Sequence, residues 1–215
     1  MTNNIILVAI ADDHPVVRLG AQTLLEKHSR IRIHKEYSDA ATLIKEFSTA
    51  QWEVLILDID LKDGNGVELT KQMLQQRPEL KILILSIYPE SKYALRAMKA
   101  GAKGYVNKDS LLDKLEDAVI QVASGKLYVS AELSQILAMK AVQKTNVEES
   151  HQILSDREMQ VLCLYGAGKS NQEIAEQLYI SKKTVSTYRG RILGKMKLKT
   201  TSELISYAIQ HQLLA

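Results

Sequence analysis

The sequence predicts a two-domain protein in which a five-stranded, doubly wound parallel α/β sheet precedes a small all-α domain. In residues 1–127, five short apolar runs alternate with segments of helical periodicity, which is the pattern of repeated βα units. Residues 128–150 hold one more helical segment and then a polar stretch without periodicity, which is typical of a linker. Residues 151–215 carry several signals for short helices and are expected to form a separate domain.

The predicted strands of the first domain are short, apolar and rich in β-branched residues, as buried parallel strands are. They end at Ala11, Tyr37, Asp58, Ser86 and Lys108. The helical segments between and after them cover residues 16–27, 39–47, 66–76, 89–101 and 111–125. Ligands of doubly wound sheets bind beyond the carboxyl ends of the strands, so the polar residues at these ends are expected to meet.

The linker is expected to include a helix from Ser130 to about Gln143, followed by the polar residues 144–152. Four short helices should follow it. Three capping boxes mark helix starts, because a hydroxyl and a carboxylate three residues later satisfy free backbone N–H groups. The boxes pair Ser155 with Glu158, Ser170 with Glu173, and Thr200 with Glu203.

Two successive helices of the second domain share one apolar face, with residues 179–181 as the turn between them. The residues expected on that face are Ile174, Ala175, Leu178, Ile180, Val185, Ile192 and Met196. Such a helix pair with a short turn fits a helix-turn-helix motif, but an ordinary helical bundle would show the same apolar face, so the opposite face of the second helix has to separate the two.

The composition is that of a globular protein with a core, since 46% of the residues are hydrophobic and 25% are charged. The apolar run near the amino terminus is short and meets Asp12 and Asp13, so neither a signal peptide nor a membrane span is expected. We expect a cytoplasmic protein with no membrane partner. The single cysteine, Cys163, cannot form an internal disulfide and is expected to pack in the core.

Positive charge is concentrated in the second domain. Residues 1–150 hold 19 lysines and arginines against 20 acidic residues, whereas residues 151–215 hold 9 against 5. Seven of these basic residues lie between Lys182 and Lys199, with no acidic residue among them. A charge run is often only a solvated face, but an unrelieved basic one in a small domain favours a binder of phosphate backbones.

Carboxylates, a hydroxyl and an ammonium group follow the predicted strands. Asp12, Asp13 and Asp58 would repel one another unless a cation neutralises them, and oxygen ligands of this kind suit Mg²⁺. Asp58 could then be the nucleophile that accepts a phosphoryl group, with Lys108 as a counter-charge and Ser86 as a hydrogen-bond donor. A zinc site is not expected at the neighbouring His14, because no second histidine lies at ligand spacing.

The segments IADDHP, VLILDIDLKDGNG, ILILS and GAKGYVNKD resemble the flavodoxin-like receiver domain of two-component response regulators. From Ile153 onward the sequence resembles the LuxR-type helix-turn-helix, so the resemblance to NarL/FixJ-like regulators covers essentially the whole chain. It implies that Asp12, Asp13, Asp58 and the backbone carbonyl of Asp60 hold Mg²⁺, and that a sensor histidine kinase phosphorylates Asp58.

The resemblance also implies a switch, in which Tyr105 swings inward when Ser86 moves toward the phosphoryl group. Two departures from the family pattern bear on it. Ser86 stands where threonine is commoner, which keeps the hydroxyl and loses a methyl group. Lys62 stands where the family usually has proline, so the loop after Asp58 is expected to be less rigid.

The helix predicted from Lys182 to about Lys197 has features that lower its own stability but favour DNA binding. It begins with two lysines, which oppose the helix macrodipole unless a phosphate lies nearby, and Gly190 costs about 1 kcal/mol relative to alanine. By resemblance, Ser186, Thr187 and Gly190 lie where the family reads base edges, with part of the readout left to neighbours or to DNA shape. The residues available to phosphates are Lys182, Lys183, Thr184, Tyr188, Arg189 and Arg191.

The partners implied are a sensor histidine kinase, promoter double-stranded DNA, RNA polymerase if the protein activates transcription, and a second copy of the chain once phosphorylated. Dimers are expected because one small recognition module buries too little surface for tight binding. The apolar stripe of the last helix is expected to be mostly domain core with a smaller share in the dimer contact. That stripe comprises Leu204, Ile205, Ala208 and Ile209.

Three functions stay open at this point. The sequence favours a phosphorylation-switched, non-enzymatic transcription factor over a receiver-type regulator that works without phosphate. The third is a haloacid-dehalogenase-like phosphatase, with Asp58 as nucleophile and Asp60 as general acid. Such a phosphatase needs an acidic pair on a later strand, but here the pair comes first, at Asp12 and Asp13.

Overall fold

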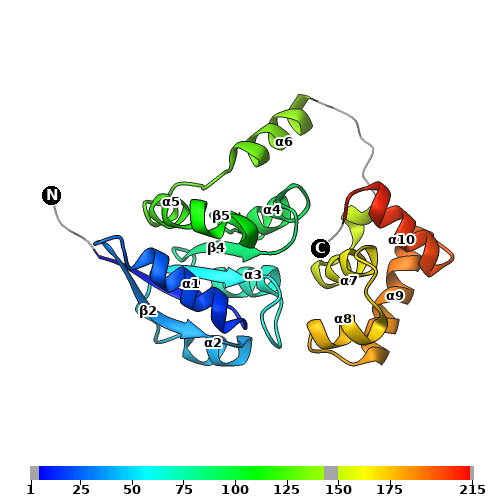
Figure 1. The fold of residues 1–215 in the computed structure, drawn as a ribbon, viewed down its shortest axis with the longest axis horizontal. Helices are drawn as coiled ribbons and strands as arrows, with labels where there is room; N and C mark the ends of the chain where they lie inside the picture. Colours follow the sequence, from blue (N-terminus) through cyan, green and yellow to red (C-terminus); the bar gives the residue numbers. More distant parts are fainter. Residues whose placement is uncertain (1–4, 143–149, 214–215) are drawn as a thin grey trace. The chain divides into compact units, whose positions relative to one another are not determined.

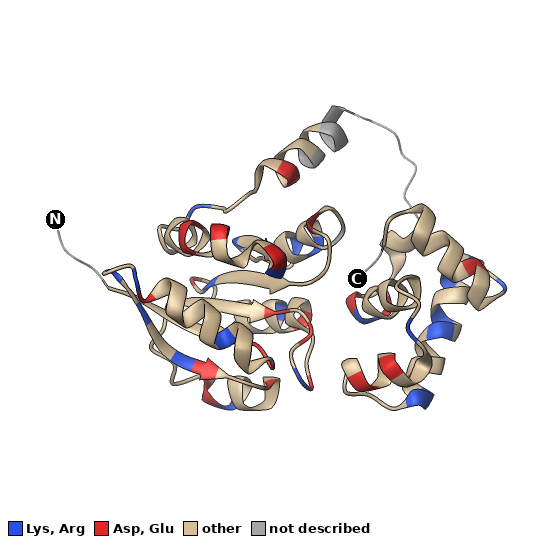
Figure 2. Ribbon diagram, viewed as in Figure 1, with Lys and Arg blue, Asp and Glu red and all other residues tan. Residues whose placement is uncertain are grey.

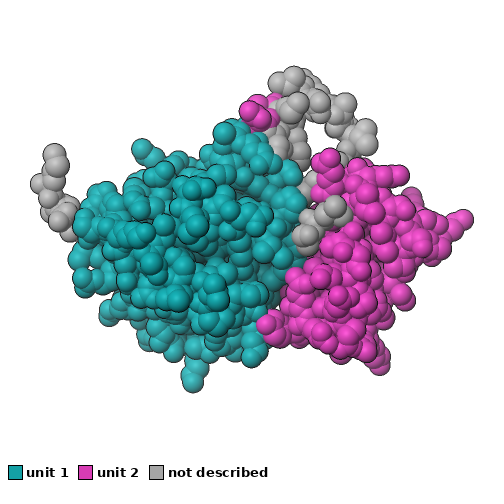
Figure 3. Space-filling model, in the orientation of Figure 1, with its two compact units in different colours: residues 1–134 teal, residues 135–215 magenta. Residues whose placement is uncertain are grey.

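The computed structural model of the chain describes residues 5–142 and 150–213. The chain divides into two compact units, residues 1–134 and 135–215 (Figure 3). Residues 144–149 of the expected linker lie outside the described residues, and the domain boundaries derived from the sequence stay a prediction. Within the described residues, no helix has both the length and the apolar character needed to cross a bilayer.

The first unit is built on a parallel sheet with strand order β2-β1-β3-β4-β5, which confirms the predicted fold class (Figure 1). The strands are β1 (Ile6–Ala11), β2 (Ile31–Tyr37), β3 (Val54–Asp58), β4 (Lys81–Ser86) and β5 (Gly104–Asn107). The chain first adds a strand on one side of β1 and then adds the rest on the other side. This reversal of direction lies between β1 and β3, where doubly wound sheets bind their ligands.

Helices cover both faces of the sheet, which explains why its strands are apolar on both sides. They are α1 (Pro15–Leu25), α2 (Ala40–Phe47), α3 (Gly66–Gln76), α4 (Glu90–Lys99) and α5 (Leu111–Ala123). On one face, α1 and α5 pack on buried residues of β1, β3, β4 and β5. Right-handed crossovers put the other three helices on the opposite face, where the alternate strand residues Leu55, Leu57 and Ile84 are equally buried.

One predicted strand end is wrong. The last strand ends at Asn107, and Lys108 begins a single 3-10 turn, η1 (Lys108–Ser110). The Asn107 side chain accepts a hydrogen bond from the backbone N–H of Asp109 at 2.8 Å, which closes the turn and takes Lys108 out of the strand. The amine is thereby free to reach back across the strand ends.

The rest of the described chain is helical, as predicted. The elements are α6 (Ala131–Val142), η2 (Ser150–Ile153), α7 (Asp156–Gly166), α8 (Asn171–Gln177), α9 (Lys182–Met196) and α10 (Thr201–Gln210). Cys163 is fully buried on α7. The expected apolar face of α8 and α9 is buried as well, except that Ile180 is only half-buried.

Two of the three predicted capping boxes form completely, at Ser155 and at Ser170. The third is half wrong. Thr200 accepts from the backbone N–H of Glu203 at 3.1 Å, but the Glu203 carboxylate accepts from Lys199 instead of Thr200. The reason lies in the sharp turn after α9, where Lys197 is left-handed (φ 56°) and the chain presents the Lys199 N–H to α10.

Candidate functional site

The sheet register brings two aspartates together at its carboxyl edge. Ala11 of β1 pairs with Leu57 of β3, so the next residues, Asp12 and Asp58, emerge side by side. Both are buried, with 0% and 2% of their surface exposed. The Lys108 Nζ lies 2.7 Å from Asp12 Oδ2 and 2.8 Å from Asp58 Oδ2, and therefore bridges the two carboxylates.

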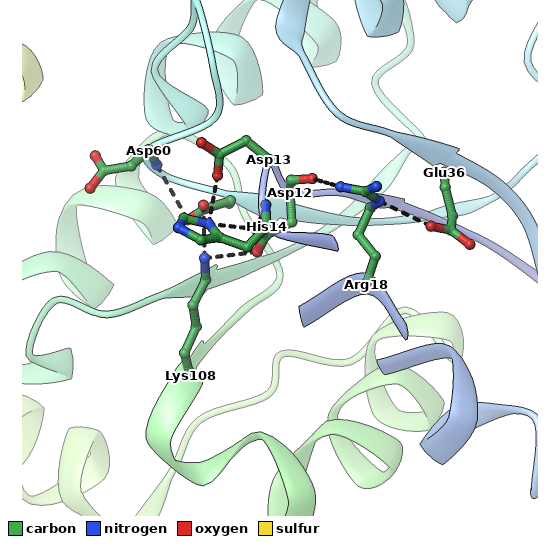
Figure 4. A network of polar contacts seen from close by, with 8 residues as sticks. Asp12, Asp13, His14, Arg18, Glu36, Asp60 and Lys108 are labelled. Atoms are coloured by element: carbon green, nitrogen blue, oxygen red, sulfur yellow. Dashed lines mark hydrogen bonds and ion pairs between the residues drawn. The ribbon is translucent and has the colours of Figure 1, made fainter. Parts of the chain in front are cut away.

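Asp13 and His14 complete this acidic pocket (Figure 4). The His14 Nδ1 lies 2.7 Å from Asp13 Oδ1 and 3.2 Å from Asp12 Oδ1. One potential ligand atom from each of Asp12, Asp13, His14 and Asp58 lies within 4.8 Å of the others. The sequence did not assign His14 to the pocket, although its position directly after the acidic pair was a usable signal.

The electrostatics of the pocket favour a further cation. Burial raises the pKa of Asp58 to about 7, against the opposing charge of Lys108, and the carboxylates of Asp12 and Asp60 add to the rise. Burial pulls the pKa of Lys108 down, but Asp58 and Asp12 together hold it above its ordinary value. One ammonium group thus faces more than one carboxylate, and a bound divalent cation would relieve their repulsion.

The loop after β3 holds Asp58 in place through close backbone packing. The Asp60 N–H donates to Asp58 Oδ1 at 3.3 Å, and Asn65 caps α3 by accepting from Val67 and Glu68. A Cβ atom at Gly66 would lie 2.3 Å from the Asp58 carbonyl oxygen. Only glycine therefore lets the start of α3 approach Asp58 this closely.

Ser86 and Tyr105 lie next to the pocket in a second hydrogen-bonded group. Ser86 follows Leu85, the residue of β4 that pairs with Asp58, and its Oγ accepts from the backbone N–H of Tyr88 at 3.1 Å. The buried Tyr105 hydroxyl donates to the Tyr88 carbonyl at 2.7 Å. Tyr88 is hydrogen-bonded to both predicted residues, and no motif in the sequence singles it out.

In the second unit, α9 buries Val185, Ile192 and Met196 and turns its other side to solvent. Basic residues lie along this helix (Figure 2). Of the nine residues predicted to contact DNA, five are exposed and four are half-buried. The exposed ones are Lys182, Lys183, Thr187, Gly190 and Arg191, and the half-buried ones are Thr184, Ser186, Tyr188 and Arg189.

The glycines of α9 serve no packing need of this chain. A Cβ atom at Gly190 or Gly194 would meet no atom within 4 Å, in contrast to Gly66. Each of them nevertheless costs about 1 kcal/mol in a helix. Packing within the described residues therefore does not explain the glycines at these two positions.

Comparisons with known proteins agree with both units. Residues 8–120 match the model of the response regulator receiver domain, and residues 152–208 match that of the bacterial regulatory proteins of the luxR family. Fimbriae Z protein of Salmonella typhimurium is 37% identical over 207 residues, which cover 96% of this chain and 98% of that protein. Oxygen regulatory protein NreC of Staphylococcus epidermidis is 34% identical, with coverages of 96% and 98%.

A solved structure extends the likeness to a DNA complex. It contains RcsB from Salmonella enterica serovar Typhimurium, bound to promoter rprA in the presence of the phosphomimetic BeF₃⁻. It is 25% identical, covers 95% of this chain and 98% of the RcsB chain, and superposes with a TM-score of 0.65.

A doubly wound domain with an acidic pocket at its switch point, followed by a helix-turn-helix unit with an open basic helix, defines a receiver-controlled DNA-binding regulator. The chain belongs to the NarL/FixJ family of two-component response regulators, with a receiver domain and a LuxR-type output domain. It is a DNA-binding transcriptional regulator and not an enzyme, which excludes the phosphatase alternative.

Proposed function

We propose that Asp58 accepts a phosphoryl group from a sensor histidine kinase in the cytoplasm, and that this modification controls promoter binding through α9. The observation that carries the proposal is the Lys108 bridge between Asp58 and Asp12, with nitrogen to oxygen distances of 2.8 and 2.7 Å. The bridge aims an ammonium group at the oxygens of a buried carboxylate. A phosphoryl group on Asp58 would therefore lie close to the positive charge of Lys108.

The donor set fits Mg²⁺, because carboxylate and carbonyl oxygens are its preferred ligands. Asp12, Asp13, Asp58 and the backbone carbonyl of Asp60 would hold the ion. When bound, it would polarise the incoming phosphoryl group and neutralise the clustered carboxylates.

In the transfer, an Asp58 oxygen attacks phosphorus, the bond from phosphorus to the kinase imidazole nitrogen breaks, and its electron pair stays on that nitrogen. Lys108 pairs with the phosphoryl oxygens, and Ser86 donates a hydrogen bond to one of them. Because Ser86 and Tyr105 are both hydrogen-bonded to Tyr88, a shift of Ser86 alters the contacts of Tyr105. We propose that this group passes the change from the pocket to α4.

For DNA binding, we propose that Ser186, Thr187 and Gly190 face base edges and that the surrounding basic and polar residues of α9 contact phosphates. The phosphorylated protein acts as a homodimer on paired half-sites, and it contacts RNA polymerase if it activates transcription. The RcsB complex with promoter DNA and a phosphomimetic supports the link between phosphorylation and promoter binding, and a structure of RcsB dimers bound to DNA supports the homodimer.

The test is to incubate the protein with a small radiolabelled phosphodonor and Mg²⁺. Wild type should become labelled, and Asp58→Asn should not. Asp109→Asn, which makes the same chemical change at an exposed carboxylate next to the pocket, is the matched control and should label normally. Absence of label on wild type, with DNA binding intact, would favour the regulator that works without phosphate.

A further inference from the structure

Three polar side chains form a line from the core of the second unit to the open side of α9. Tyr165 of α7 donates from its hydroxyl to Asn171 Oδ1 of α8 at 2.6 Å. The Asn171 Nδ2 donates to Ser186 Oγ of α9 at 3.2 Å. Tyr165 is 3% exposed, whereas Asn171 and Ser186 are half-buried. The line thus ends on a residue that is expected to touch DNA.

The direction of these hydrogen bonds follows from the chemistry of the groups. A buried hydroxyl must give its proton to an acceptor, and an amide offers one acceptor end and one donor end. Burial raises the pKa of Tyr165, although the positive charge of Arg189 opposes the rise, so the phenol keeps its proton. The phenol donates this proton to Asn171 Oδ1, which leaves the amide nitrogen to face Ser186.

Ser186 Oγ therefore accepts a hydrogen bond from Asn171, and the proton of the Ser186 hydroxyl takes no part in this line. Among the described residues, no hydrogen bond engages this proton. The neighbouring Thr187 differs, because its hydroxyl already donates to the Lys183 carbonyl of its own helix at 3.0 Å. Gly190 lies one turn after Ser186 on the same side, and no atom lies within 4 Å of its Cβ position.

We propose that Tyr165 and Asn171 are positioning residues that orient the Ser186 hydroxyl, so that its proton is presented to DNA. The inference rests on the proposed docking of α9 on DNA and deepens it. The group that receives this proton is an acceptor: a base-edge atom such as guanine O6, guanine N7 or thymine O4, or a phosphate oxygen.

The test uses the full-length protein and a duplex selected by wild type from a random-sequence library. Ser186→Ala should weaken binding about fivefold, the value of one hydrogen bond, and Tyr165→Phe about threefold, because the amide can then turn over. The double variant should bind no more weakly than Ser186→Ala alone, since residues in one hydrogen-bond line are not additive. Tyr207→Phe is the matched control. It removes a phenol that hydrogen-bonds to His151 at 3.0 Å, away from this line, and should leave affinity unchanged.

Independent, additive losses for Tyr165→Phe and Ser186→Ala would overturn the proposal, with thermal unfolding measured on each variant to confirm that it is folded. It would also be overturned if neither variant lost affinity while Lys183→Ala lowered the salt dependence, a result that leaves the proposed function standing. Failure of the wild type, phosphorylated or not, to select any duplex would instead overturn the proposed function. Single base substitutions in the duplex distinguish the two kinds of acceptor. If both variants lose the sequence preference at one base pair, the acceptor is a base edge. If both variants lose affinity uniformly across sequences, the acceptor is a phosphate oxygen.

Discussion

The buried Asp58 carboxyl group lowers the stability of the fold at neutral and higher pH. Burial raises the pKa of Asp58 to about 7, so the folded protein holds a proton there over a pH range in which the unfolded chain has released it. A carboxyl group with a raised pKa stabilises the fold in its protonated form. That stabilisation is complete below about pH 4 and is lost as the pH rises through about 7.

We therefore expect Asp58→Asn to be more stable than wild type at pH 8 and nearly equal to it at pH 4. The gap should widen as the pH rises from about 4 to 8 in the absence of divalent cations, and Mg²⁺ should narrow it by stabilising wild type. Urea unfolding at several pH values measures it. Asp109→Asn removes an exposed carboxylate and should show no such widening. A gap independent of pH would contradict the charge balance described for the pocket.

Gly66 lies at the start of α3, where a Cβ atom would lie 2.3 Å from the Asp58 carbonyl oxygen and 2.9 Å from Ile59 Cα. Both neighbours are backbone atoms of a buried strand end, so α3 itself must move. We expect Gly66→Ala to lower the free energy of unfolding by about 1–3 kcal/mol and to reduce labelling of Asp58. Gly20→Ala is the matched control, because no atom lies within 4 Å of its Cβ position in α1. Equal effects of the two changes on stability would refute the packing argument.

Helices and strands were predictable to the extent that local chemistry defines them. Asp39, Asn65, Ser155 and Ser170 each cap a helix with their own side chains, and such ends can be recognised in the sequence. The two errors arose where a neighbouring element decides the outcome. Lys108 leaves its strand because Asn107 closes a turn, and Glu203 reaches Lys199 because of the turn that ends α9.

Among these elements, α9 carries glycines that lower its stability and leave its surface open to DNA. The variant Gly190→Ala tests both effects. Gly190→Ala should raise the free energy of unfolding by about 1 kcal/mol, because the new methyl group meets no atom of the chain within 4 Å. It should also lower affinity for the selected duplex about tenfold, the loss of one base contact. Unfolding and DNA titrations on the same preparation measure both effects.

Gly194→Ala provides the comparison, since it lies one turn later in equally open surroundings. It should bring the same gain in stability with a smaller loss of affinity, because the start of the helix lies deepest in the groove. A gain in stability at Gly190 without any loss in DNA binding would remove this stretch of α9 from the interface.

For the molecule as a whole, the predictable part of the site followed from topology and the rest did not. Asp12, Asp58 and Lys108 end or follow strands of one parallel sheet, so knowing the fold was enough to bring them together. The contact of Tyr165 with Asn171, and of Asn171 with Ser186, depends on how three helices pack. A hydrophobic pattern gives the buried face of each helix but not the side chains that meet between them.

The exposed surface of α10 bears on how two copies of the chain assemble. On α10, Leu204 and Ala208 are fully buried, whereas Ile209 is 54% exposed at the edge of the same stripe. We expect Ile209 to lie in the contact between two DNA-bound copies, where a charge would be costly to bury. Ile209→Glu in the phosphorylated protein should lower affinity for a duplex with two half-sites at least about tenfold and leave single half-site affinity unchanged, because only the first requires the pair.

Ile153→Glu is the matched control for this change, since Ile153 is 51% exposed in the same unit and lies outside α10. Binding titrations on the two duplexes, with sedimentation of each complex, separate a dimer effect from a general one. A second copy adds a second set of phosphate contacts, so wild type should also show a steeper salt dependence on the double site than Ile209→Glu does. If Ile209→Glu weakened both duplexes equally, α10 would be acting through the fold of its own domain, and the dimer contact would have to lie elsewhere on the chain.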